Sequence, residues 1–372
     1  MGEWRKYSLL ELSDIHNEKR IPLSKMQRLK LQGKYPYYGA SGIVDYINDY
    51  KFNGDYILIS EDGENLKTRK TPIAFKASGK FWVNNHAHII KGKTDYLDDL
   101  LIYFFSNLDL NQYLTGAVQP KLSKGTLLNI PIYLPKDESE KKAIAEVLSS
   151  LDDKIDLLHR QNKTLEELAQ TLFRQWFIEE AKNEWEVGKV PDEFNFTMGL
   201  SPKGETFNED GVGTPMYQGN ADFEFRFPKN RVYTTDPKRY AEKFDTLISV
   251  RAPVGAQNMA KEKCCIGRGV ASFRYKADSS FYTYTYFKMM SLMNEIKQFN
   301  DSGTVFGSIN KTDFQNMKII IPPTNLVVKY QGEVKPLDDK VIQNTFQIKI
   351  LENMRDTLLP KLMNGEVRIK YE

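Results

Sequence analysis

Two long segments of the chain carry apolar residues at alternating spacings of three and four. Such a heptad pattern, sustained over several repeats, is typical of a helix that packs along one partner helix. Asn162 and Ala169 fill the remaining positions of the first series. The other members of the first series are Ile144, Leu148, Leu151, Ile155, Leu158, Leu165, Leu172 and Trp176. The second series is Leu337, Val341, Asn344, Ile348, Leu351, Arg355, Leu358 and Leu362.

The starts of both helices have recognisable signals. Asp137 stands three residues before Glu140, which predicts an N-cap with a capping box for the first helix. Pro336 lies at the start of the second helix or in its interior, so we expect a fresh helix start or a kink there. Because a narrow seam calls for a single partner, we expect the two helices to pair with each other. The alternative is that each helix lies flat on its own globular domain, which usually requires a wider apolar stripe.

The sequence Leu-Asp-Asp-Lys occurs twice, at Leu151 and at Leu337, and these positions are 186 residues apart in a chain of 372. The repeat extends to the segments between the helices. "YPYYGASG" at Tyr35 resembles "TPMYQGNA" at Thr214, and "KLSKGTLLNIPIYLP" at Lys121 resembles "SINKTDFQNMKIIIP" at Ser308. Internal repeats indicate a duplicated architecture. The sequence therefore predicts a globular unit of mixed helices and strands followed by a long helix, twice over.

Positive charge is concentrated in blocks, although the net charge is only +3. Residues 19–44 hold six basic residues and no acid, and residues 65–94 hold seven and no acid. Residues 246–277 hold six basic residues against one acid, whereas residues 137–180 have a net charge of −5. Basic surface in both halves suits a bound polyanion such as a nucleic acid. The alternative is that these are ordinary solvated faces.

The duplicated order of these elements resembles the specificity (S) subunit of type I restriction–modification systems. The residues that carry the resemblance are "YPYYGASG", "KLSK" and "INKT" before "IPIYLP" and "IIIPP", "KKAIAEVLSSLDDKIDLL", "LFRQWF" and "LLPKLMNGEV". The resemblance implies an α+β fold with two similar target recognition domains, separated by two helices that form an antiparallel coiled coil with an internal pseudo-twofold repeat. The expected boundaries are 1–136 and 183–323 for the domains, and 137–182 and 324–372 for the helices with the C-terminal tail.

The same resemblance implies sequence-specific binding of a bipartite double-stranded DNA target. The implied partners are two modification (methyltransferase) subunits and two restriction (motor–nuclease) subunits. The subunit itself would be non-catalytic and would hold no cofactor or metal, because ATP and S-adenosylmethionine would belong to the partners. The N-terminal sequence lacks a signal-peptide pattern and the chain has no apolar run of about 18 residues, so we expect a cytoplasmic protein without membrane contact.

Candidate DNA contacts are basic, amide and hydroxyl side chains, which bind phosphates and base edges. For each single residue, a solvated loop is an equally good interpretation. The candidates in the first half are Lys34, Tyr38, Ser41, Lys67, Arg69, Lys70, Lys80, Asn84, Asn85, His86, Lys121 and Lys124. Those in the second half are Arg226, Lys229, Arg231, Arg251, Lys261, Lys263, Arg268, Ser308, Asn310 and Lys311.

Catalytic motifs are weak in this chain. His86 and His88 could be a metal pair, but a third ligand is missing from their neighbourhood in the sequence. "CIGRGVA" at Cys265 lacks the third glycine of a dinucleotide fingerprint. "IIIPPT" at Ile319 lacks the asparagine and the aromatic residue of the adenine-methyltransferase motif. A stand-alone two-domain DNA-cleaving enzyme and a coiled-coil scaffold protein are the alternatives to a DNA-recognition subunit.

The seams also predict a register. If Asn162 faces Asn344, the two amides bond each other directly or share one water, and so specify the alignment. The further layers then join Leu158 with Ile348, Ile155 with Leu351, Leu165 with Val341, Leu148 with Leu358, and Ile144 with Leu362, and leave Leu151 awkwardly opposite Arg355. Phe173, Trp176 and Phe177 exceed what one seam buries, so they either bind a protein partner or pack on their own domain.

Changing the length of both helices should change only the spacing of the recognised DNA half-sites. One added heptad lengthens a helix by about 10 Å, which corresponds to about three base pairs. Methylation mapping in cells that carry the chain and its partners measures the effect. The half-site sequences should stay the same while their separation grows. Altered half-sites at a constant separation would contradict the prediction.

Overall fold

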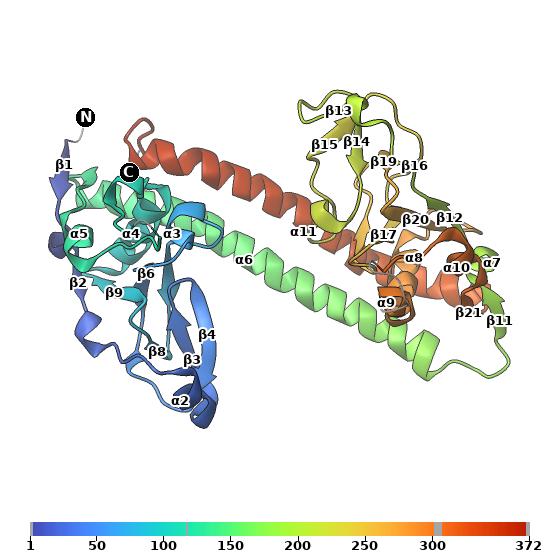
Figure 1. The fold of residues 1–372 in the computed structure, drawn as a ribbon, viewed down its shortest axis with the longest axis horizontal. Coiled ribbons are helices and arrows are strands. Elements are labelled where there is room, and N and C mark those ends of the chain that lie inside the picture. Colours follow the sequence, from blue (N-terminus) through green and yellow to red (C-terminus); the bar gives the residue numbers. More distant parts are fainter. Residues whose placement is uncertain (1–2, 117, 301–306, 370–372) are drawn as a thin grey trace. The chain divides into compact units, whose positions relative to one another are not determined.

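The computed structural model describes residues 3–116, 118–300 and 307–369. It divides into two compact units: unit 1 comprises Met1–Asp156 and Ile350–Glu372, and unit 2 comprises Leu157–Lys349. The long helices α6 (Glu138–Arg174) and α11 (Thr324–Met363) each contribute one segment to either unit. Each unit therefore consists of a globular part and two helix segments (Figure 1).

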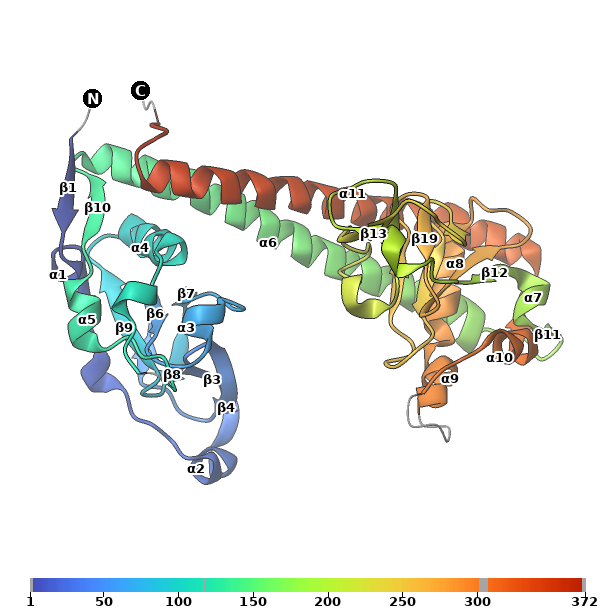
Figure 2. The same ribbon diagram turned by 45° about the horizontal axis from the view of Figure 1, so that its top comes forward.

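Unit 1 contains two four-stranded sheets and a two-stranded ribbon. The main sheet is antiparallel, whereas in the second sheet β3 runs parallel to β8. Figure 2 shows β6, β8 and β9 next to one another in this unit. The main sheet has the order β2 (Ser13–Ile15), β9 (Ala87–Gly92), β6 (Tyr56–Ser60), β7 (Ala74–Ala77). The second has the order β4 (Gly42–Ile47), β3 (Gln32–Gly39), β8 (Lys80–Val83), β5 (Phe52–Asn53), and the ribbon pairs β1 (Trp4–Tyr7) with β10 (Ile132–Pro135).

Unit 2 repeats this topology strand for strand, with one additional edge strand. Its second sheet again contains one parallel pair, β14 with β19. The main sheet has the order β12 (Phe194–Met198), β20 (Val270–Tyr275), β17 (Thr246–Ser249), β18 (Gln257–Met259). The second has the order β13 (Phe207–Asn208), β15 (Val232–Thr234), β14 (Thr214–Tyr217), β19 (Cys264–Ile266), β16 (Tyr240–Ala241), and the ribbon pairs β11 (Glu186–Lys189) with β21 (Lys318–Ile321).

Three of the short helices in each unit occupy equivalent places in the strand order: α1 corresponds to α7, α4 to α8, and α5 to α10. Unit 1 contains α1 (Leu9–Leu12), α2 (Lys25–Lys30), α3 (Asn65–Thr68), α4 (Asp95–Asn107) and α5 (Lys124–Asn129). Unit 2 contains α7 (Val190–Glu193), α8 (Tyr282–Ser291), α9 (Met293–Lys297) and α10 (Lys311–Asn316). The duplicated α+β fold predicted from the repeat is therefore confirmed.

The helix segments of each unit run antiparallel. In unit 2, the Asn162 amide donates to Thr345 Oγ1 at 3.4 Å, and the Tyr330 hydroxyl donates to the Ala169 carbonyl at 3.0 Å. In unit 1, Arg355 donates to Asp152 at 2.8 Å. The contacts of Asn162 and Arg355 match the predicted alignment to within one residue. Tyr330, by contrast, lies seven residues before Leu337, the position that this alignment places opposite Ala169. The position predicted as awkward is satisfied because Arg355 reaches the carboxylate next to Leu151.

The two seam amides bond each other's neighbours. Asn344 donates to Gln161 Oε1 at 3.4 Å, as Asn162 does to Thr345. Both amides are buried, and their carbonyl oxygens have no hydrogen-bond partner among the described residues. A direct bond between the two amides, one of the two arrangements predicted, is thus not observed, because the flanking side chains supply an acceptor to each amide.

The predicted helix starts hold only in part. Asp137 is the N-cap of α6, since its Oδ1 accepts from the Ser139 amide at 2.9 Å. The Glu140 carboxylate binds the Arg368 guanidinium. Of the two alternatives for Pro336, the interior position is the one observed, because α11 begins at Thr324.

Aromatic side chains at the end of α6 pack into the core of unit 2. Phe173 and Phe177 are buried beside Tyr330 and Tyr284, and Trp176 lies at the edge of the same cluster. Of the two alternatives for "LFRQWF", packing on the chain's own domain is therefore correct. The core of unit 1 is more aliphatic and includes Ile144 and Leu148 of α6 together with Leu362 of α11.

Both copies of Leu-Asp-Asp-Lys attach a globular part to a long helix. In unit 1, Asp152 accepts from the Tyr103 hydroxyl of α4 at 2.7 Å. In unit 2, Asp338 accepts from Thr283 of α8 at 2.8 Å and pairs with the Arg226 guanidinium. Both α4 and α8 pack on the main sheet of their unit. The repeated carboxylate thus connects each main sheet, through one short helix, to its long-helix segment.

Arg226 was predicted to contact DNA, but it is a buried structural residue. Its side chain has no exposed surface, lies over the Tyr286 ring at 3.9 Å and pairs with Asp338, which is equally buried. Burial alone would lower the pKa of Arg226, but Asp338, followed by Tyr286 and Glu166, holds this pKa above its ordinary value. The guanidinium is thus charged inside unit 2 and does not reach the surface.

Replacing Arg226 by alanine should destabilise unit 2 strongly. The substitution leaves the Asp338 carboxylate buried without its cation, which costs about 3–5 kcal/mol. Arg231→Ala is the matched control, because that guanidinium is 52% exposed beside Asp222 and an exposed pair contributes about 0–1 kcal/mol. Urea unfolding followed by circular dichroism compares the two variants. An equal loss of unfolding free energy in both variants would contradict the structural role of Arg226.

Candidate nucleic-acid interface

Three segments of unit 1 meet at one edge, which we call loop edge 1: Glu61–Glu64, Asn84–His86 and Lys121–Lys124. Strands β6 and β9 are antiparallel with Ser60 opposite Ala87, so the end of one strand meets the start of the other. The Glu61 amide donates to the His86 carbonyl at 2.9 Å, and the Leu122 amide donates to the Glu61 carbonyl at 2.8 Å. Backbone hydrogen bonds therefore fix all three segments together.

Unit 2 builds the same arrangement, loop edge 2, from Val250–Pro253, Gly267–Gly269 and Ser308–Lys311. The Val250 amide donates to the Gly269 carbonyl at 2.9 Å, and the Ile309 amide donates to the Val250 carbonyl at 3.0 Å. An isolated bridge joins Arg251 to Ser308, as one joins Asp62 to Lys121 in unit 1. The two loop edges are thus equivalent in backbone structure and different in side chains.

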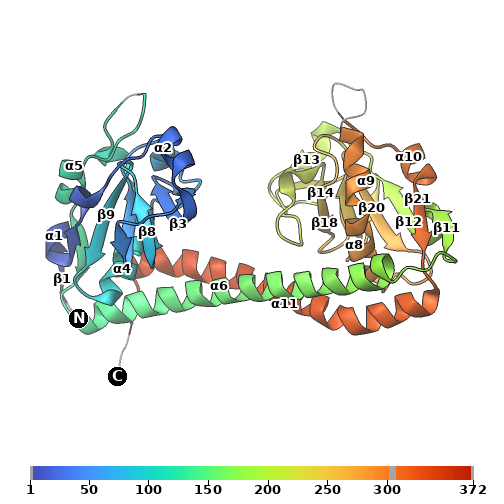
Figure 3. The same ribbon diagram turned by 90° about the horizontal axis from the view of Figure 1, so that it is seen from below.

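Each loop edge lies at the end of the main sheet that is remote from the long-helix segments of its unit. At the other end of β9, the Gly92 amide donates to Asp98 of α4 at 2.6 Å, and Tyr96 of the same helix contacts Glu138 of α6. Six residues of strand separate the two ends by about 20 Å. Figure 3 shows the sheets of each unit on one side of its helix segments.

Glu61 organises loop edge 1. Its carboxylate accepts from Arg20 at 2.6 Å and lies 3.5 Å from the Lys121 ammonium. Burial alone would raise its pKa, but the hydrogen bond and charge of Arg20 and the charge of Lys121 hold the pKa of Glu61 below its ordinary value. The carboxylate is therefore ionised, and it keeps the Lys121 segment against the end of β6.

His88 is a structural residue behind loop edge 1. It is completely buried, and its Nδ1 lies 2.9 Å from the Asn17 amide nitrogen while its Nε2 lies 2.8 Å from the Leu122 carbonyl. These partners fit a neutral ring that donates from Nε2. His86, by contrast, is exposed and contacts Asp62 at 2.8 Å. The described residues contain no cluster of three potential metal ligands.

A tight turn presents Arg268 on loop edge 2. The Arg268 amide donates to Ser201 Oγ at 3.1 Å. A Cβ atom on the neighbouring Gly269 would lie 2.1 Å from the Gln218 carbonyl oxygen, so only glycine fits there. The turn is therefore held closely against the adjoining segments, while the Arg268 side chain is exposed.

Many of the predicted residues converge on the loop edges. The Ser60 hydroxyl donates to the Ala40 carbonyl at 2.5 Å, which brings the hairpin turn with Ser41 to loop edge 1. The helix α3 begins directly after Glu64, and Lys67 lies on it while Lys70 lies just beyond its end. The predicted residues on loop edge 1 are Asn84, Asn85, His86, Lys121 and Lys124. Those on loop edge 2 are Arg251, Arg268, Ser308, Asn310 and Lys311.

Three of the residues predicted to contact DNA have mainly structural contacts. Asn84 is buried, and its side chain accepts from the His86 amide at 2.8 Å. Tyr38 is half-buried against Phe81. Asn310 is the N-cap of α10, and its side-chain oxygen accepts from the backbone amides of Thr312 and Asp313.

Other predicted residues lie elsewhere. Lys34 and Lys80 stand at the starts of the parallel strands β3 and β8, and the loop edge lies at the opposite ends of these strands. Arg69 donates to the Ser106 carbonyl at 2.7 Å and to that of Leu108, and so satisfies the end of α4. Sequence reasoning could not separate these residues from the others, because a basic block does not reveal which strand end its members occupy.

In unit 2, four further predicted residues lie away from loop edge 2. Arg231 pairs with Asp222 at 2.8 Å, in the segment that also contains Lys229 and the buried Arg226. Lys261 lies over the Phe346 ring of α11 at 5.6 Å. Lys263 pairs with Glu242 at 3.0 Å. These contacts place Lys261 beside a long-helix segment and hold Arg231 and Lys263 in ion pairs, while the Lys229 backbone amide donates to the Asp222 carbonyl at 2.7 Å.

Some residues at the loop edges escaped the sequence analysis. Arg20 bridges Glu61 and the Ala87 carbonyl, and Ser201 and Gln218 support the Arg268 turn. Arg20 was visible as part of a basic block, but its acidic partner is 41 residues away in the sequence. Ser201 and Gln218 gave no signal, because small polar residues are common in loops.

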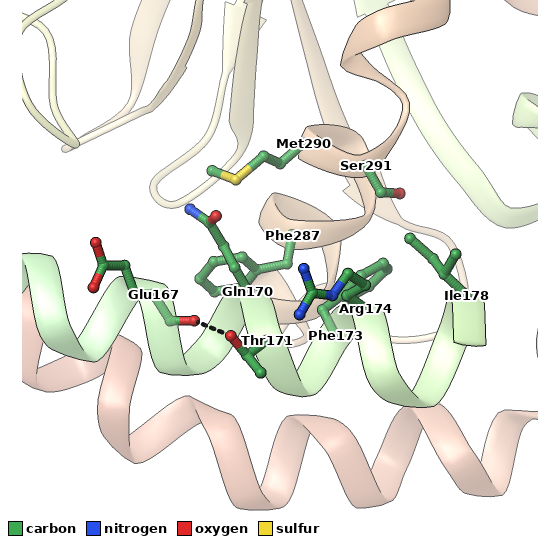
Figure 4. Close-up of a pocket in the computed structure, with 9 residues that line it drawn as sticks. All are labelled: Glu167, Gln170, Thr171, Phe173, Arg174, Ile178, Phe287, Met290 and Ser291. Atoms are coloured by element: carbon green, nitrogen blue, oxygen red, sulfur yellow. Dashed lines mark hydrogen bonds between the residues drawn. The ribbon is translucent and has the colours of Figure 1, made fainter. Parts of the chain in front are cut away.

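A pocket of 490 Å³ lies between α6 and α8 in unit 2 (Figure 4). Phe173, Phe287 and Met290 line it together with polar side chains such as Gln170. Its one cation, Arg174, is paired with Glu179 at 3.1 Å. The pocket therefore lacks the free positive charge of a nucleic-acid site.

Within the described part of the chain, no helix is long and apolar enough to cross a membrane.

Comparisons with known proteins agree with this architecture. The model of the type I restriction modification DNA specificity domain matches the chain twice, over residues 1–167 and 182–349. The chain is 28% identical over 351 residues to the type I restriction enzyme MjaIX specificity subunit of Methanocaldococcus jannaschii, which covers 84% of this chain and 80% of that protein. It is 22% identical to the HindI specificity subunit of Haemophilus influenzae over 99% and 100% of the two chains. The crystal structure of a type I S subunit from M. genitalium shares the fold, with a TM-score of 0.71 and 18% identity over 97% of this chain and 96% of that one.

Stability should depend on pH through His88. Burial lowers the pKa of this histidine below its ordinary value of 6.5. The unfolded chain therefore binds a proton more readily, so His88 favours the folded state above about pH 6.5 and this contribution is lost as the pH falls through the lowered pKa. His88→Gln should reduce the loss of unfolding free energy between pH 7.5 and pH 5.5, as measured in urea. His159→Gln, at an exposed position of α6, is the control. An unchanged pH dependence in His88→Gln would contradict the prediction.

Proposed function

Because this chain belongs to the family of type I restriction modification DNA specificity proteins, we propose that each of its loop edges binds one half of a bipartite double-stranded DNA target. The observation that carries the proposal is the duplicated edge itself. Three segments are joined by the same backbone hydrogen bonds in both units, and each edge exposes cationic and hydrogen-bonding side chains.

The chemistry of the two edges supports different half-sites. Loop edge 1 combines Asn85, the pair of His86 with Asp62, and Lys121. Loop edge 2 has Arg251 at the position of Asp62, and Arg268 one residue before the acceptor Gly269. Lysine and arginine contacts to phosphates supply affinity, whereas amide and guanidinium contacts in a groove supply specificity. Equivalent positions with different donors and acceptors would read different bases.

The chain would act as the non-catalytic recognition component of a larger complex. Its relatives are named as specificity subunits of type I restriction enzymes, and the comparisons give no support to a stand-alone nuclease or a scaffold. We propose that two modification and two restriction subunits join it and carry S-adenosylmethionine and ATP. We further propose that these partners bind away from the loop edges, since those must stay open to DNA.

Removing the cations of loop edge 2 should weaken DNA binding and lower its salt dependence. The variant Arg251→Ala, Arg268→Ala, Lys311→Ala loses up to three phosphate-neutralising groups, so the slope of log K against log salt should fall by about 0.9 for each contact that is lost. The variant Lys229→Ala, Lys261→Ala, Lys263→Ala removes the same charge from the same unit and is the control. Titration of target DNA at several salt concentrations compares them. Equal weakening by both variants would contradict the assignment of the edge.

The footprint of the assembled complex should have two parts. Each loop edge should protect one stretch of DNA, and the stretch between them should be less protected. Substitutions on loop edge 2 should weaken one protected stretch and leave the position of the other unchanged. Hydroxyl-radical footprinting gives this pattern at single-nucleotide resolution. One continuous footprint, weakened uniformly by the substitutions, would refute bipartite recognition.

A further inference from the structure

Asn85 and Arg268 occupy the same position in the two units. The amide of Glu61, directly after β6, donates to the carbonyl of His86. The amide of Val250, directly after β17, donates to the carbonyl of Gly269. The strands that follow are aligned in the same way, with Ala87 opposite the end of β6 and Val270 opposite the end of β17. Counting back one residue from each acceptor carbonyl aligns Asn85 with Arg268.

At both positions the backbone is held while the side chain is open. The Asn85 carbonyl accepts from Arg20 at 3.4 Å, and the Arg268 amide donates to Ser201 at 3.1 Å. Both side chains are exposed, and neither makes a hydrogen bond or ion pair with the described residues. Arg231 of unit 2 is a useful contrast, because its guanidinium is committed to Asp222 at 2.8 Å.

The turns that carry these residues are braced from behind. In unit 1, Arg20 also donates to the Ala87 carbonyl at 2.9 Å and to Glu61 at 2.6 Å. In unit 2, a Cβ atom on Gly267 would lie 3.1 Å from Ser201 Oγ, and one on Gly269 would clash with the Gln218 carbonyl. A braced backbone with a free polar side chain suits readout of a base, because little ordering of the backbone is needed when the contact forms.

We infer that Asn85 reads an adenine in one half-site and that Arg268 reads a guanine at the corresponding place in the other half-site. An asparagine amide matches N6 and N7 of adenine in the major groove, and a guanidinium matches O6 and N7 of guanine. The proton donors and acceptors of the two side chains therefore select different purines from the same backbone position. This inference rests on the proposed function and adds the identity of one base in each half-site.

The test uses the full chain assembled with its modification subunits. The wild-type complex selects its target from a randomised duplex library, and the selected sequences are compared with those of Arg268→Lys and Arg268→Asn. A lysine keeps the charge but loses the bidentate geometry, so the guanine at one position of one half-site should lose about 5- to 150-fold of its preference, as expected for one bidentate contact. Arg268→Asn should move the preference at that position from guanine towards adenine.

The reciprocal variant and a matched control complete the test. Asn85→Arg should replace an adenine by a guanine in the other half-site, and each substitution should leave the opposite half-site unchanged. Arg231→Asn makes the same chemical change away from the loop edge, and it should alter no base preference. If Arg268→Lys retained every base preference, or if Arg268→Asn only weakened binding uniformly across all sequences, Arg268 would be a phosphate contact and the inference would be wrong. If the wild-type complex itself selected no split sequence, the proposed function would fall, which is a different result.

Discussion

In each unit, the first aspartate of the Leu-Asp-Asp-Lys sequence accepts a hydrogen bond from the helix that packs on the main sheet, α4 or α8. Both units depend on this contact. Asp152 accepts from Tyr103 in unit 1, and Asp338 accepts from Thr283 and pairs with Arg226 in unit 2. In the heptad repeat these carboxylates follow the seam leucines Leu151 and Leu337. The Leu-Asp-Asp-Lys sequence therefore has two roles: its leucine belongs to the helix seam, and the carboxylate of its first aspartate binds the globular part of the unit.

The loop edges follow from this attachment and from the pairing of antiparallel strands. Since one end of β9 or β20 is held near the helix segments, the other end carries its turn to the far side of the unit. The backbone hydrogen bonds that join the three segments of each edge do not depend on side-chain identity. Exposed side chains on the edge can therefore change without loss of the fold, which explains how two units with one topology present Asn85 in one case and Arg268 in the other.

Much of the architecture could be predicted from the sequence, because its signals are periodic or repeated. The heptads at Leu151 and Leu337 predicted the helix pair and its alignment, and the duplication predicted two similar units. The direct Asn162–Asn344 bond was not observed, because Gln161 and Thr345 supply acceptors to the two amides. The candidate site was predicted less well. A basic block shows that charge is present, but only the fold shows that Arg226 is buried and that Lys80 lies at the wrong end of its strand.

Site-specific cross-linking tests the central claim, that the two loop edges read separate parts of one DNA target. The two natural cysteines, Cys264 and Cys265, are both buried, so cysteines introduced at positions 85 and 268 can be labelled selectively with a photo-crosslinker. In the assembled complex on target DNA, cross-links from position 85 should map to one half-site and those from position 268 to the other, while a cysteine at position 80 should give few cross-links. Cross-links from both edge positions to the same half-site, or stronger cross-linking from position 80 than from either edge, would contradict the account.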